Sequence, residues 1–374
     1  MFFIVPPARA PLMTPRIRSG EATLSITSPS LLTLVVIGAV IVPLALVLVR
    51  QRTKATWQRA VGSWVAVVVA QVLAVASLGL YVNRQYGFYS SWDDALGKTD
   101  NGAAAIAAGG VDASSAGSGR FESFPITTPG GGTAQSVAWL PPGYHDKTNA
   151  NKRYPVLVVL PGYANTVGST VENLNFGQTA SALVEKGTTA PFVAVFAPYQ
   201  TVQGRDTECT NITHGPQELT FLTRTVPNAI RSHLRVAKES KQWSALGWST
   251  GGYCAAKALY TRSGSPWGSA VSMGGYFESM TDGTTGDLYR SKSERDLNSP
   301  SHLYRLYQMP TTRMLVVASR EDKATWTTSK RMADLAKADP HVSAMWIAHG
   351  GHNYNTYVPH LGEMIQWAFT QPQT

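Results

Sequence analysis

Apolar and polar residues divide the chain into two parts with different patterns. Near the N-terminus, residues 31–49 (LLTLVVIGAVIVPLALVLV) and 61–82 (VGSWVAVVVAQVLAVASLGLYV) form two apolar runs without a charged side chain. At 1.5 Å of rise per residue, each run nearly matches a hydrocarbon core of about 30 Å. We therefore expect two transmembrane helices, and Pro43 is tolerated in such a helix. The alternative is a pair of buried core helices, or a signal peptide followed by one core helix.

Beyond residue 120 the pattern changes to short β-rich runs separated by helix-length stretches. Strands are predicted at 134–140, 154–160, 192–198, 243–249, 269–274, 313–319 and 343–349. Helices are predicted at 169–187, 217–234, 251–262, 328–338 and 356–370. Such alternation predicts an α/β fold, with a mainly parallel sheet covered by helices on both faces. The segment 275–308 interrupts the rhythm, and we expect it to form a cap or lid over the carboxyl edge of the sheet.

The connecting region has a different composition. Aromatic residues suited to a membrane interface follow the second apolar run, at Tyr86, Phe88, Tyr89 and Trp92. Residues 101–120 are mostly Ala, Gly and Ser, which is typical of a flexible linker. We therefore divide the chain into an N-terminal tail (1–30), two transmembrane helices (31–82), an interfacial segment with a linker (83–120) and a catalytic domain (121–374).

Composition and charge exclude several classes of protein. Hydrophobic residues make up 44% of the chain and charged residues 15%, which excludes a disordered protein, and two cysteines exclude a disulfide-rich scaffold. The net charge of +9 is concentrated before residue 93, where eight Lys/Arg face one acid, whereas residues 121–374 hold 22 basic and 18 acidic residues. A nucleic-acid enzyme would carry its basic surface on the folded domain. The sequence also has no metal-ligand cluster, phosphate-binding glycine loop or dinucleotide motif, so we expect no cofactor.

The basic loop between the apolar runs predicts the orientation. Residues 50–59 carry four Lys/Arg and no acid, so this loop should stay in the cytoplasm and the C-terminal domain should face outward. Three more sparsely spaced arginines precede residue 31, and translation could start at Met1 or Met13. We expect a multi-pass plasma-membrane protein with an extracytoplasmic domain.

The motif that carries chemistry is Gly247-Trp248-Ser249-Thr250-Gly251. A bare Gly-x-Ser-x-Gly pattern is a weak signal. Here it lies where a predicted strand turns into a predicted helix, the setting that exposes a nucleophilic serine at the edge of a sheet. An ordinary glycine-rich turn is the alternative.

A serine nucleophile needs a base and an orienting carboxylate, which should follow in the order serine, acid, histidine after later strands. Arg320-Glu321-Asp322 follows one strand and Gly350-Gly351-His352 follows the next. We expect His352 to be the base, because His349 still belongs to the predicted strand. Asp322 is the favoured acid, because the shorter carboxylate one step further out usually faces the imidazole, and Glu321 is the alternative.

An oxyanion hole needs two backbone N–H donors. One should come from Thr250, directly after the nucleophile. The other should come from the loop after the strand at 154–160, where Pro161 has no N–H and Tyr163 is preferred to Gly162.

Two cysteines flank the predicted nucleophile helix. Cys254 lies one turn into that helix and Cys209 lies in the loop RDTECTNITHG. A disulfide is expected if the domain faces an oxidising compartment, and two free buried thiols are the alternative. Asp206 and Glu208 in the same loop could contact substrate, but a solvated loop face is the simpler interpretation.

These segments together resemble a known family. VAWLPPGY at 137–144, YPVLVVLPGY, GWSTGGYCA and GGHNYNTY look like the putative-esterase family of α/β-hydrolases, which includes S-formylglutathione hydrolases, feruloyl esterases and antigen-85 mycolyltransferases. The apolar hairpin and the following NRQYGFYSSW look like an actinobacterial membrane-anchored branch. The resemblance implies an acyl-enzyme mechanism with Ser249, Asp322 and His352 at the matching positions. Family members commonly have His-Gly where this chain has Pro161-Gly162.

Three functions are compatible with these observations. The first is a serine esterase that acts on carboxylic esters. The second is an acyltransferase that passes an acyl group to a sugar or lipid hydroxyl of the cell envelope. The third is a non-catalytic membrane-tethered binding module, which the complete serine, acid and histidine order disfavours. The expected partners are an ester or acyl-lipid substrate and the membrane, with no nucleic acid.

Overall fold

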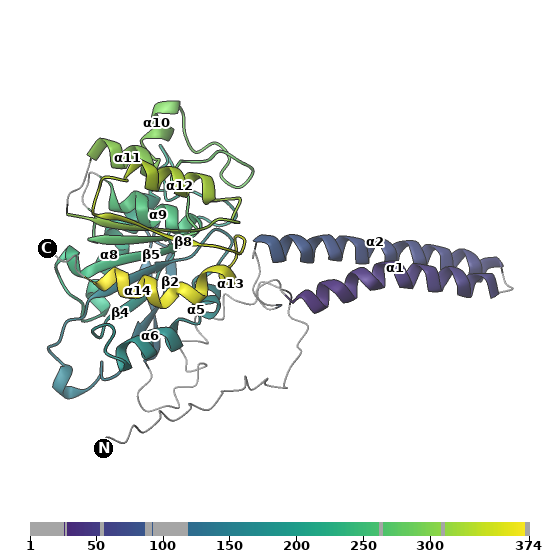
Figure 1. The fold of residues 1–374 in the computed structure, drawn as a ribbon, viewed down its shortest axis with the longest axis horizontal. Helices are drawn as coiled ribbons and strands as arrows, with labels where there is room; N and C mark the ends of the chain where they lie inside the picture. The colour runs from purple at the N-terminus through teal and green to yellow at the C-terminus, as the bar shows by residue number, and fades with distance from the viewer. Residues whose placement is uncertain are drawn as a thin grey trace, which may run out of the picture.

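The computed structural model describes residues 26, 28–52, 56–86, 92, 119–261, 265–307 and 311–370. Figure 1 shows a helical hairpin that projects from an α/β domain. The hairpin consists of α1 (Pro29–Arg52) and α2 (Thr56–Tyr86). The predicted tail before residue 26, most of the interfacial segment and nearly all of the predicted linker lie outside the described residues.

The hairpin presents apolar side chains to its surroundings. Val40 and Leu44 of α1, and Val75 and Leu78 of α2, are among the large side chains left exposed. Within the described residues, the helix Thr56–Arg84 is the one long and apolar enough to cross a membrane, and only 6% of its most apolar window is buried. Pro29–Ala45 is a shorter apolar helix. Neither helix therefore lies in the core of the α/β domain.

The domain is built on an eight-stranded sheet with the order β1-β2-β4-β3-β5-β6-β7-β8. β1 and β2 are antiparallel to each other, β2 is antiparallel to β4, and all other neighbours are parallel. The strands are β1 (Arg120–Thr127), β2 (Thr133–Leu140), β3 (Val156–Leu160), β4 (Val193–Phe196), β5 (Trp243–Trp248), β6 (Ser269–Met273), β7 (Arg313–Ser319) and β8 (Val342–Ile347). The seven predicted strand segments correspond to β2–β8, and β1 was not predicted. β1 contains Pro125, which is tolerated because this strand lies at the sheet edge.

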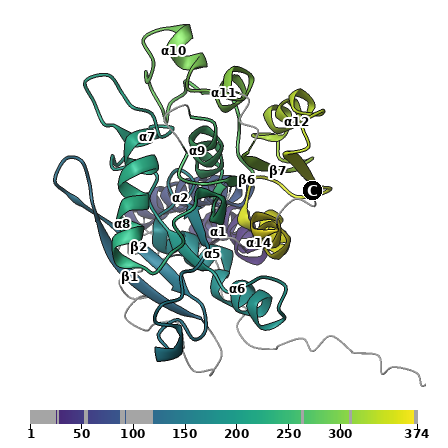
Figure 2. The same cartoon turned by 90° about the vertical axis from the view of Figure 1, so that its left-hand side faces the viewer.

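Alternating side chains of the central strands build two cores, one on each face of the sheet. In β3, Val156, Val158 and Leu160 pack into one core, and Leu157 and Val159 pack into the other. The first core is covered by α8 (Val226–His233), α9 (Thr250–Leu259) and α12 (Trp326–Leu335). The second is covered by α5 (Val167–Leu174), α6 (Phe176–Glu185) and α14 (Leu361–Phe369). Figure 2 shows helices on both sides of the strands, as the sequence pattern predicts.

Local residue chemistry divides two of the predicted helices. The predicted helix at 169–187 is divided at Asn175, whose φ of 45° is left-handed, a conformation that asparagine tolerates better than most residues. The predicted helix at 356–370 is divided into α13 (Tyr354–Tyr357), a 3₁₀ turn that contains Pro359, and α14. Proline cannot donate the backbone hydrogen bond that a continuous helix needs.

The segment expected to form a cap contains two short helices, α10 (Lys292–Asp296) and α11 (Pro300–Tyr307). Figure 2 shows both on the same side of the sheet as α9. The preceding loop reaches across to residues 205–210, where the Asp206 N–H donates to the Thr284 carbonyl at 3.0 Å and the Met280 N–H donates to Glu208 at 3.0 Å. The segment therefore packs beside α9 and is joined to the loop that follows β4.

Candidate active site

A tight turn at Ser249 joins β5 to α9. Ser249 has φ 53° and ψ −119°, a combination that non-glycine residues rarely adopt. Two glycines make the turn possible, because a Cβ on Gly247 would lie 2.0 Å from the Gly251 carbonyl oxygen and one on Gly251 would lie 2.4 Å from the Pro161 carbonyl oxygen. The sequence motif therefore forms a strained strand–turn–helix elbow that holds the serine at the carboxyl edge of the sheet.

Three residues far apart in sequence form a continuous hydrogen-bond chain at this edge. His352 Nε2 lies 2.9 Å from Ser249 Oγ, and His352 Nδ1 lies 2.7 Å from Asp322 Oδ2. Asp322 follows β7 and His352 lies in the loop between β8 and α13. The arrangement allows the imidazole to accept the serine proton while the carboxylate orients the ring.

Asp322 is buried completely and accepts hydrogen bonds from two further side chains. Tyr357 Oη donates to Asp322 Oδ2 at 2.7 Å, and Thr325 Oγ1 donates to the same oxygen at 2.8 Å. Burial raises the pKa of Asp322, but the hydrogen bond and charge of His352, followed by the hydrogen bonds of Tyr357 and Thr325, outweigh it and hold the pKa below its ordinary value. The carboxylate therefore stays ionised beside the imidazole.

Glu321 and His349 pair with each other at the surface. His349 Nδ1 lies 2.9 Å from Glu321 Oε1, and the Gly350 N–H donates to Glu321 Oε2 at 2.8 Å. The side chain of His349 is 85% exposed and that of Glu321 is 56% exposed. β8 ends at Ile347, so the expectation that His349 belongs to the strand is wrong. Glu321 instead contacts the loop that carries His352.

Two aromatic residues that the sequence analysis did not single out surround the imidazole and the carboxylate. Trp248 stacks on His352, and Tyr357 packs against Trp248 while it donates to Asp322. Trp248 stands within the serine motif and Tyr357 within the segment GGHNYNTY. In the sequence, the only sign of their role is that both are aromatic residues within the motifs. Their contacts with His352 and Asp322 depend on the fold.

Two of the residues expected to line the oxyanion hole, Gly162 and Thr250, lie beside Ser249. Gly162 lies against the elbow, since a Cβ there would be 2.8 Å from Trp248 Cδ1 and 3.1 Å from Ser249 Cβ. Tyr163 follows in a turn in which the Asn165 N–H donates to the Gly162 carbonyl at 3.1 Å. Thr250 is the first residue of α9, where a backbone N–H has no partner within the helix.

Cys209 and Cys254 form a disulfide, with their Cα atoms 5.9 Å apart. The alternative of two free thiols is therefore wrong. The expectation that Asp206 and Glu208 lie on a solvated face of the same loop is wrong. Asp206 is 3% exposed and Glu208 is fully buried. Both carboxylates accept hydrogen bonds, Asp206 from Thr250 and Glu208 from Met280 and Tyr289.

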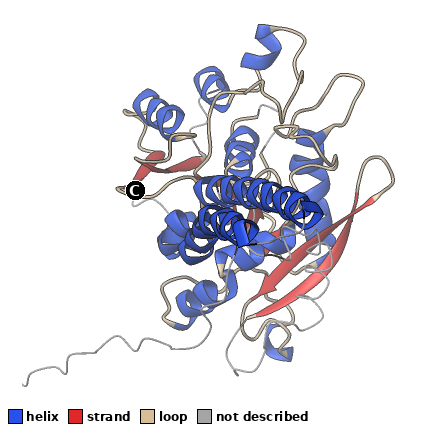
Figure 3. Cartoon of the chain, turned by 90° about the vertical axis from the view of Figure 1, so that its right-hand side faces the viewer, coloured by secondary structure: helices blue, strands red, loops and turns tan. Residues whose placement is uncertain are grey.

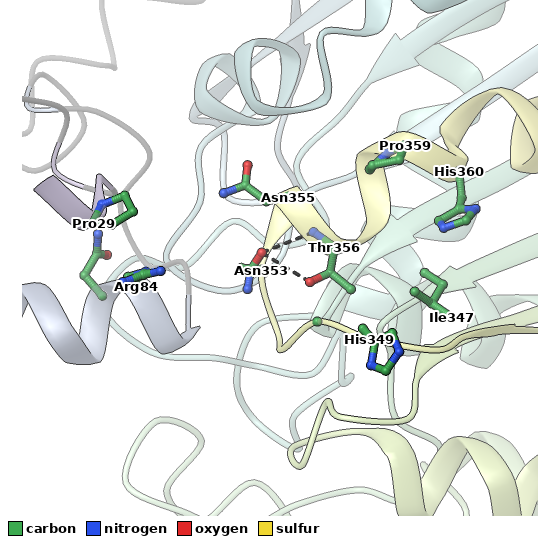
Figure 4. Close-up of a pocket in the computed structure, with 11 residues that line it drawn as sticks. Pro29, Arg84, Ile347, His349, Asn353, Asn355, Thr356, Pro359 and His360 are labelled. Atoms are coloured by element: carbon green, nitrogen blue, oxygen red, sulfur yellow. Dashed lines mark hydrogen bonds between the residues drawn. The ribbon is translucent and has the colours of Figure 1, made fainter. Parts of the chain in front are cut away.

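An open cleft of about 620 Å³, lined by both polar and apolar side chains, lies between the hairpin and the loop that carries the imidazole. Its domain side includes His349, Gly350, Asn353 and Thr356, and Figure 4 shows Arg84 and Pro29 of the hairpin opposite them. Viewed from the hairpin side, the two helices stand in front of the α/β domain (Figure 3). The hairpin therefore ends beside the carboxyl edge of the sheet, close to the loop of His352. Among the described residues, no group of His, Cys, Asp and Glu is arranged to hold a metal ion.

Comparison with known families identifies the domain. A family model described as "Putative esterase" matches residues 132–371. The chain belongs to this esterase family. The domain has the α/β-hydrolase fold that the sequence predicts. The chain is an enzyme that acts as a carboxylic ester hydrolase.

Solved structures of other esterases share the fold at low sequence identity. A ferulic acid esterase is 16% identical with a TM-score of 0.55, and the match covers 67% of this chain and 98% of that one. A fluorophosphonate-binding serine hydrolase from Staphylococcus aureus is 14% identical with a TM-score of 0.56, covering 68% and 100%. The S-formylglutathione hydrolase of the same organism is 15% identical with a TM-score of 0.54, covering 67% and 99%. No curated protein matches this esterase significantly.

Proposed function

We propose that this esterase uses Ser249, His352 and Asp322 as a catalytic triad. The observation that supports the assignment is the hydrogen-bond chain of 2.9 Å and 2.7 Å that joins the three side chains across the ends of β5, β7 and β8. Glu321 is the weaker candidate for the acid, because it pairs with His349 and is exposed.

The proposed reaction proceeds through an acyl-enzyme. Ser249 Oγ attacks the ester carbonyl carbon while His352 Nε2 takes the hydroxyl proton, and the resulting oxyanion accepts hydrogen bonds from the N–H groups of Thr250 and Tyr163 or Gly162. Collapse of the tetrahedral intermediate breaks the bond to the alcohol, which leaves with the proton from His352. Water, deprotonated by the same imidazole, then attacks the acyl-enzyme. The second tetrahedral intermediate breaks its bond to Ser249 Oγ, His352 returns the proton to that oxygen, and the acid product leaves.

The decisive experiment replaces Ser249 with alanine. Ser249→Ala is expected to lower kcat for a p-nitrophenyl ester by a factor on the order of 10⁶ and to abolish labelling by a fluorophosphonate probe, with an unchanged circular dichroism spectrum. Ser272→Ala is the matched control, because Ser272 is a buried serine on the neighbouring strand β6 and lies outside the hydrogen-bond chain. Activity of Ser249→Ala within tenfold of the wild type would place the nucleophile elsewhere.

We further propose that α1 and α2 anchor the enzyme as a transmembrane hairpin with the domain on the extracytoplasmic side. Supporting observations are the exposed apolar surface of both helices, the basic loop at 50–59 and a disulfide, which persists in oxidising compartments. Protease added to intact cells should cleave the segment at 101–120. Cleavage only after lysis would place the domain in the cytoplasm.

Acyl transfer to a sugar or lipid hydroxyl is the second candidate function, and the open cleft between the hairpin and the His352 loop favours it, because this cleft lies on the side of the proposed membrane anchor. Mass spectrometry of the acyl-enzyme formed with native envelope lipid, and then of the products that it releases, separates the two reactions. A free acid indicates hydrolysis, whereas a new ester indicates transfer.

A further inference from the structure

A buried carboxylate that the proposed mechanism does not use lies beside the first residue of the nucleophile helix. Thr250 Oγ1 donates to Asp206 Oδ2 at 2.7 Å, and Asp206 is only 3% exposed. The hydrogen bond engages the side chain of Thr250. The backbone N–H of the same residue, at the first position of α9, therefore remains available for the oxyanion.

The carboxylate of Asp206 is itself held in place. Its Oδ1 accepts the N–H of Glu208 at 3.0 Å and the hydroxyl of Tyr199 at 3.3 Å, and Tyr199 is also buried. Burial raises the pKa of Asp206, and hydrogen bonds from Thr250, Glu208 and Tyr199 oppose that increase. Every oxygen of this side chain has a partner, so its position is determined by the loop.

The loop is joined to α9 at three points along one face of the helix. Thr250 is bonded to Asp206, Cys254 to Cys209 through the disulfide, and Lys257 Nζ to the Glu208 carbonyl at 2.9 Å. Residues four and seven positions beyond Thr250 lie on its face of an α-helix. The loop therefore follows the helix from its catalytic end, and it can transmit its own position to the Thr250 amide.

We propose that Asp206 is a positioning residue for the oxyanion hole: it holds Thr250 so that the Thr250 N–H points at the developing oxyanion, and the Cys209–Cys254 disulfide fixes Asp206 for that purpose. This inference rests on the proposed function. Thr250 contacts the reacting atoms through its backbone, and Asp206 acts only through Thr250.

The test compares Thr250→Val, Asp206→Ala and the double variant in the full-length protein. Thr250→Val keeps the backbone N–H and the shape of the side chain but removes the hydrogen bond. Each single variant is expected to lower kcat for a soluble p-nitrophenyl ester by up to about 100-fold, because misplacement of a catalytic donor by about 1 Å has an effect of that size. KM should change less than about twofold, because the oxyanion contact forms in the transition state.

The double variant is expected to be no slower than the slower single variant, because both changes remove one link. Affinity for a trifluoromethyl ketone, whose hemiketal oxyanion occupies the hole, should fall in parallel with kcat. Thr250→Ser, which retains the hydroxyl, should recover most of the loss caused by Thr250→Val. Thr223→Val is the matched control, because Thr223 is a buried threonine outside this loop that donates to the Leu219 carbonyl at 2.7 Å. Its melting temperature should fall without a change in kcat.

Losses that multiply in the double variant, or an unchanged affinity for the ketone, would overturn the role of Asp206. If Asp206→Ala fails to fold, Thr250→Val, Thr250→Ser and the ketone still decide the question. Fluorophosphonate labelling of wild-type Ser249 separates this result from a failure of the proposed function. A labelled wild type with multiplicative losses refutes only the inference about Asp206, whereas an unlabelled Ser249 refutes the triad itself.

Discussion

The indole of Trp248 lies flat on the imidazole of His352, with ring centroids 4.5 Å apart and an angle of 23° between the planes. Trp248 is 3% exposed and also contacts Tyr354 and Tyr357. Trp248, the residue directly before the proposed nucleophile, therefore packs against one face of the proposed base, His352. A single backbone segment thus places the serine and restricts the ring that must receive its proton.

Replacement of Trp248 should therefore affect catalysis through the orientation of His352. We expect Trp248→Leu to lower kcat by about 10- to 100-fold, because the base loses the surface that fixes its ring. Trp248→Phe retains a flat aromatic face and should lose much less activity. Steady-state kinetics with a p-nitrophenyl ester measure the effect, and melting temperatures show whether each variant folds. Equal activity of the Leu and Phe variants would show that stacking does not position the base.

The two adjacent acids after β7 should behave very differently. Asp322→Asn is expected to lower kcat by about 10³- to 10⁴-fold, because an amide beside Nδ1 favours the wrong imidazole tautomer. Glu321→Gln should change kcat far less, since Glu321 pairs with the exposed His349. The comparison uses two isosteric substitutions at neighbouring positions. A larger loss for Glu321→Gln would transfer the role of the acid to that residue.

The disulfide should contribute both to stability and to the site. Cys209 and Cys254 are separated by 45 positions, and closing a loop of that length stabilises a protein by about 4 kcal/mol in the chain-entropy model. Reduction should lower the melting temperature, and activity should fall before global unfolding because the loop that holds Asp206 loosens first. Alkylation of the denatured, unreduced protein measures the bond. Two labelled cysteines per chain would show that it is absent.

Stability should depend on pH through the buried pair of Glu208 and Lys257. Burial raises the pKa of Glu208 and lowers that of Lys257, and the charge of each partner opposes the shift of the other. A carboxyl group whose pKa is raised in the folded protein loses stability as the pH rises from its ordinary pKa through its folded pKa. A lysine whose pKa is lowered in the folded protein loses stability as the pH falls from its ordinary pKa through its folded pKa. Because both folded pKa values are about 7, the slope of Glu208 acts below about pH 7 and that of Lys257 acts above it, so the wild type should be least stable near pH 7.

Lys257→Met removes the slope of Lys257 and the charge that lowers the pKa of Glu208, so the melting temperature of this variant should continue to fall above about pH 7, where that of the wild type should rise. Adding Glu208→Gln should remove the extra slope. Lys330→Met is the control, because Lys330 forms an exposed pair with Asp334 at the surface. Identical pH profiles for Lys257→Met and the wild type would show that the two buried groups are not linked.

Sequence patterns predicted the elements whose causes are local. Apolar runs such as 154–160 indicated the buried parallel strands, and the Gly-x-Ser-x-Gly segment at a strand–helix boundary indicated the elbow at Ser249. Local rules also explain the differences: Asn175 and Pro359 each divide a predicted helix, and β1 was not predicted because it contains Pro125 in an edge strand. The position of Asp322 and His352 after successive strands followed from chain order in this fold.

The sequence by itself therefore determined the fold class, the family resemblance and the candidate triad, because periodicity, turn chemistry and the order of motifs are properties of neighbouring residues. Only the tertiary structure decided how residues distant in sequence meet. It paired Glu321 with His349 and Asp322 with His352, buried Asp206 against Thr250 and stacked Trp248 on the imidazole. These contacts depend on sheet order and on the packing of loops at one edge of the sheet, and no local pattern in the chain encodes the distances between them.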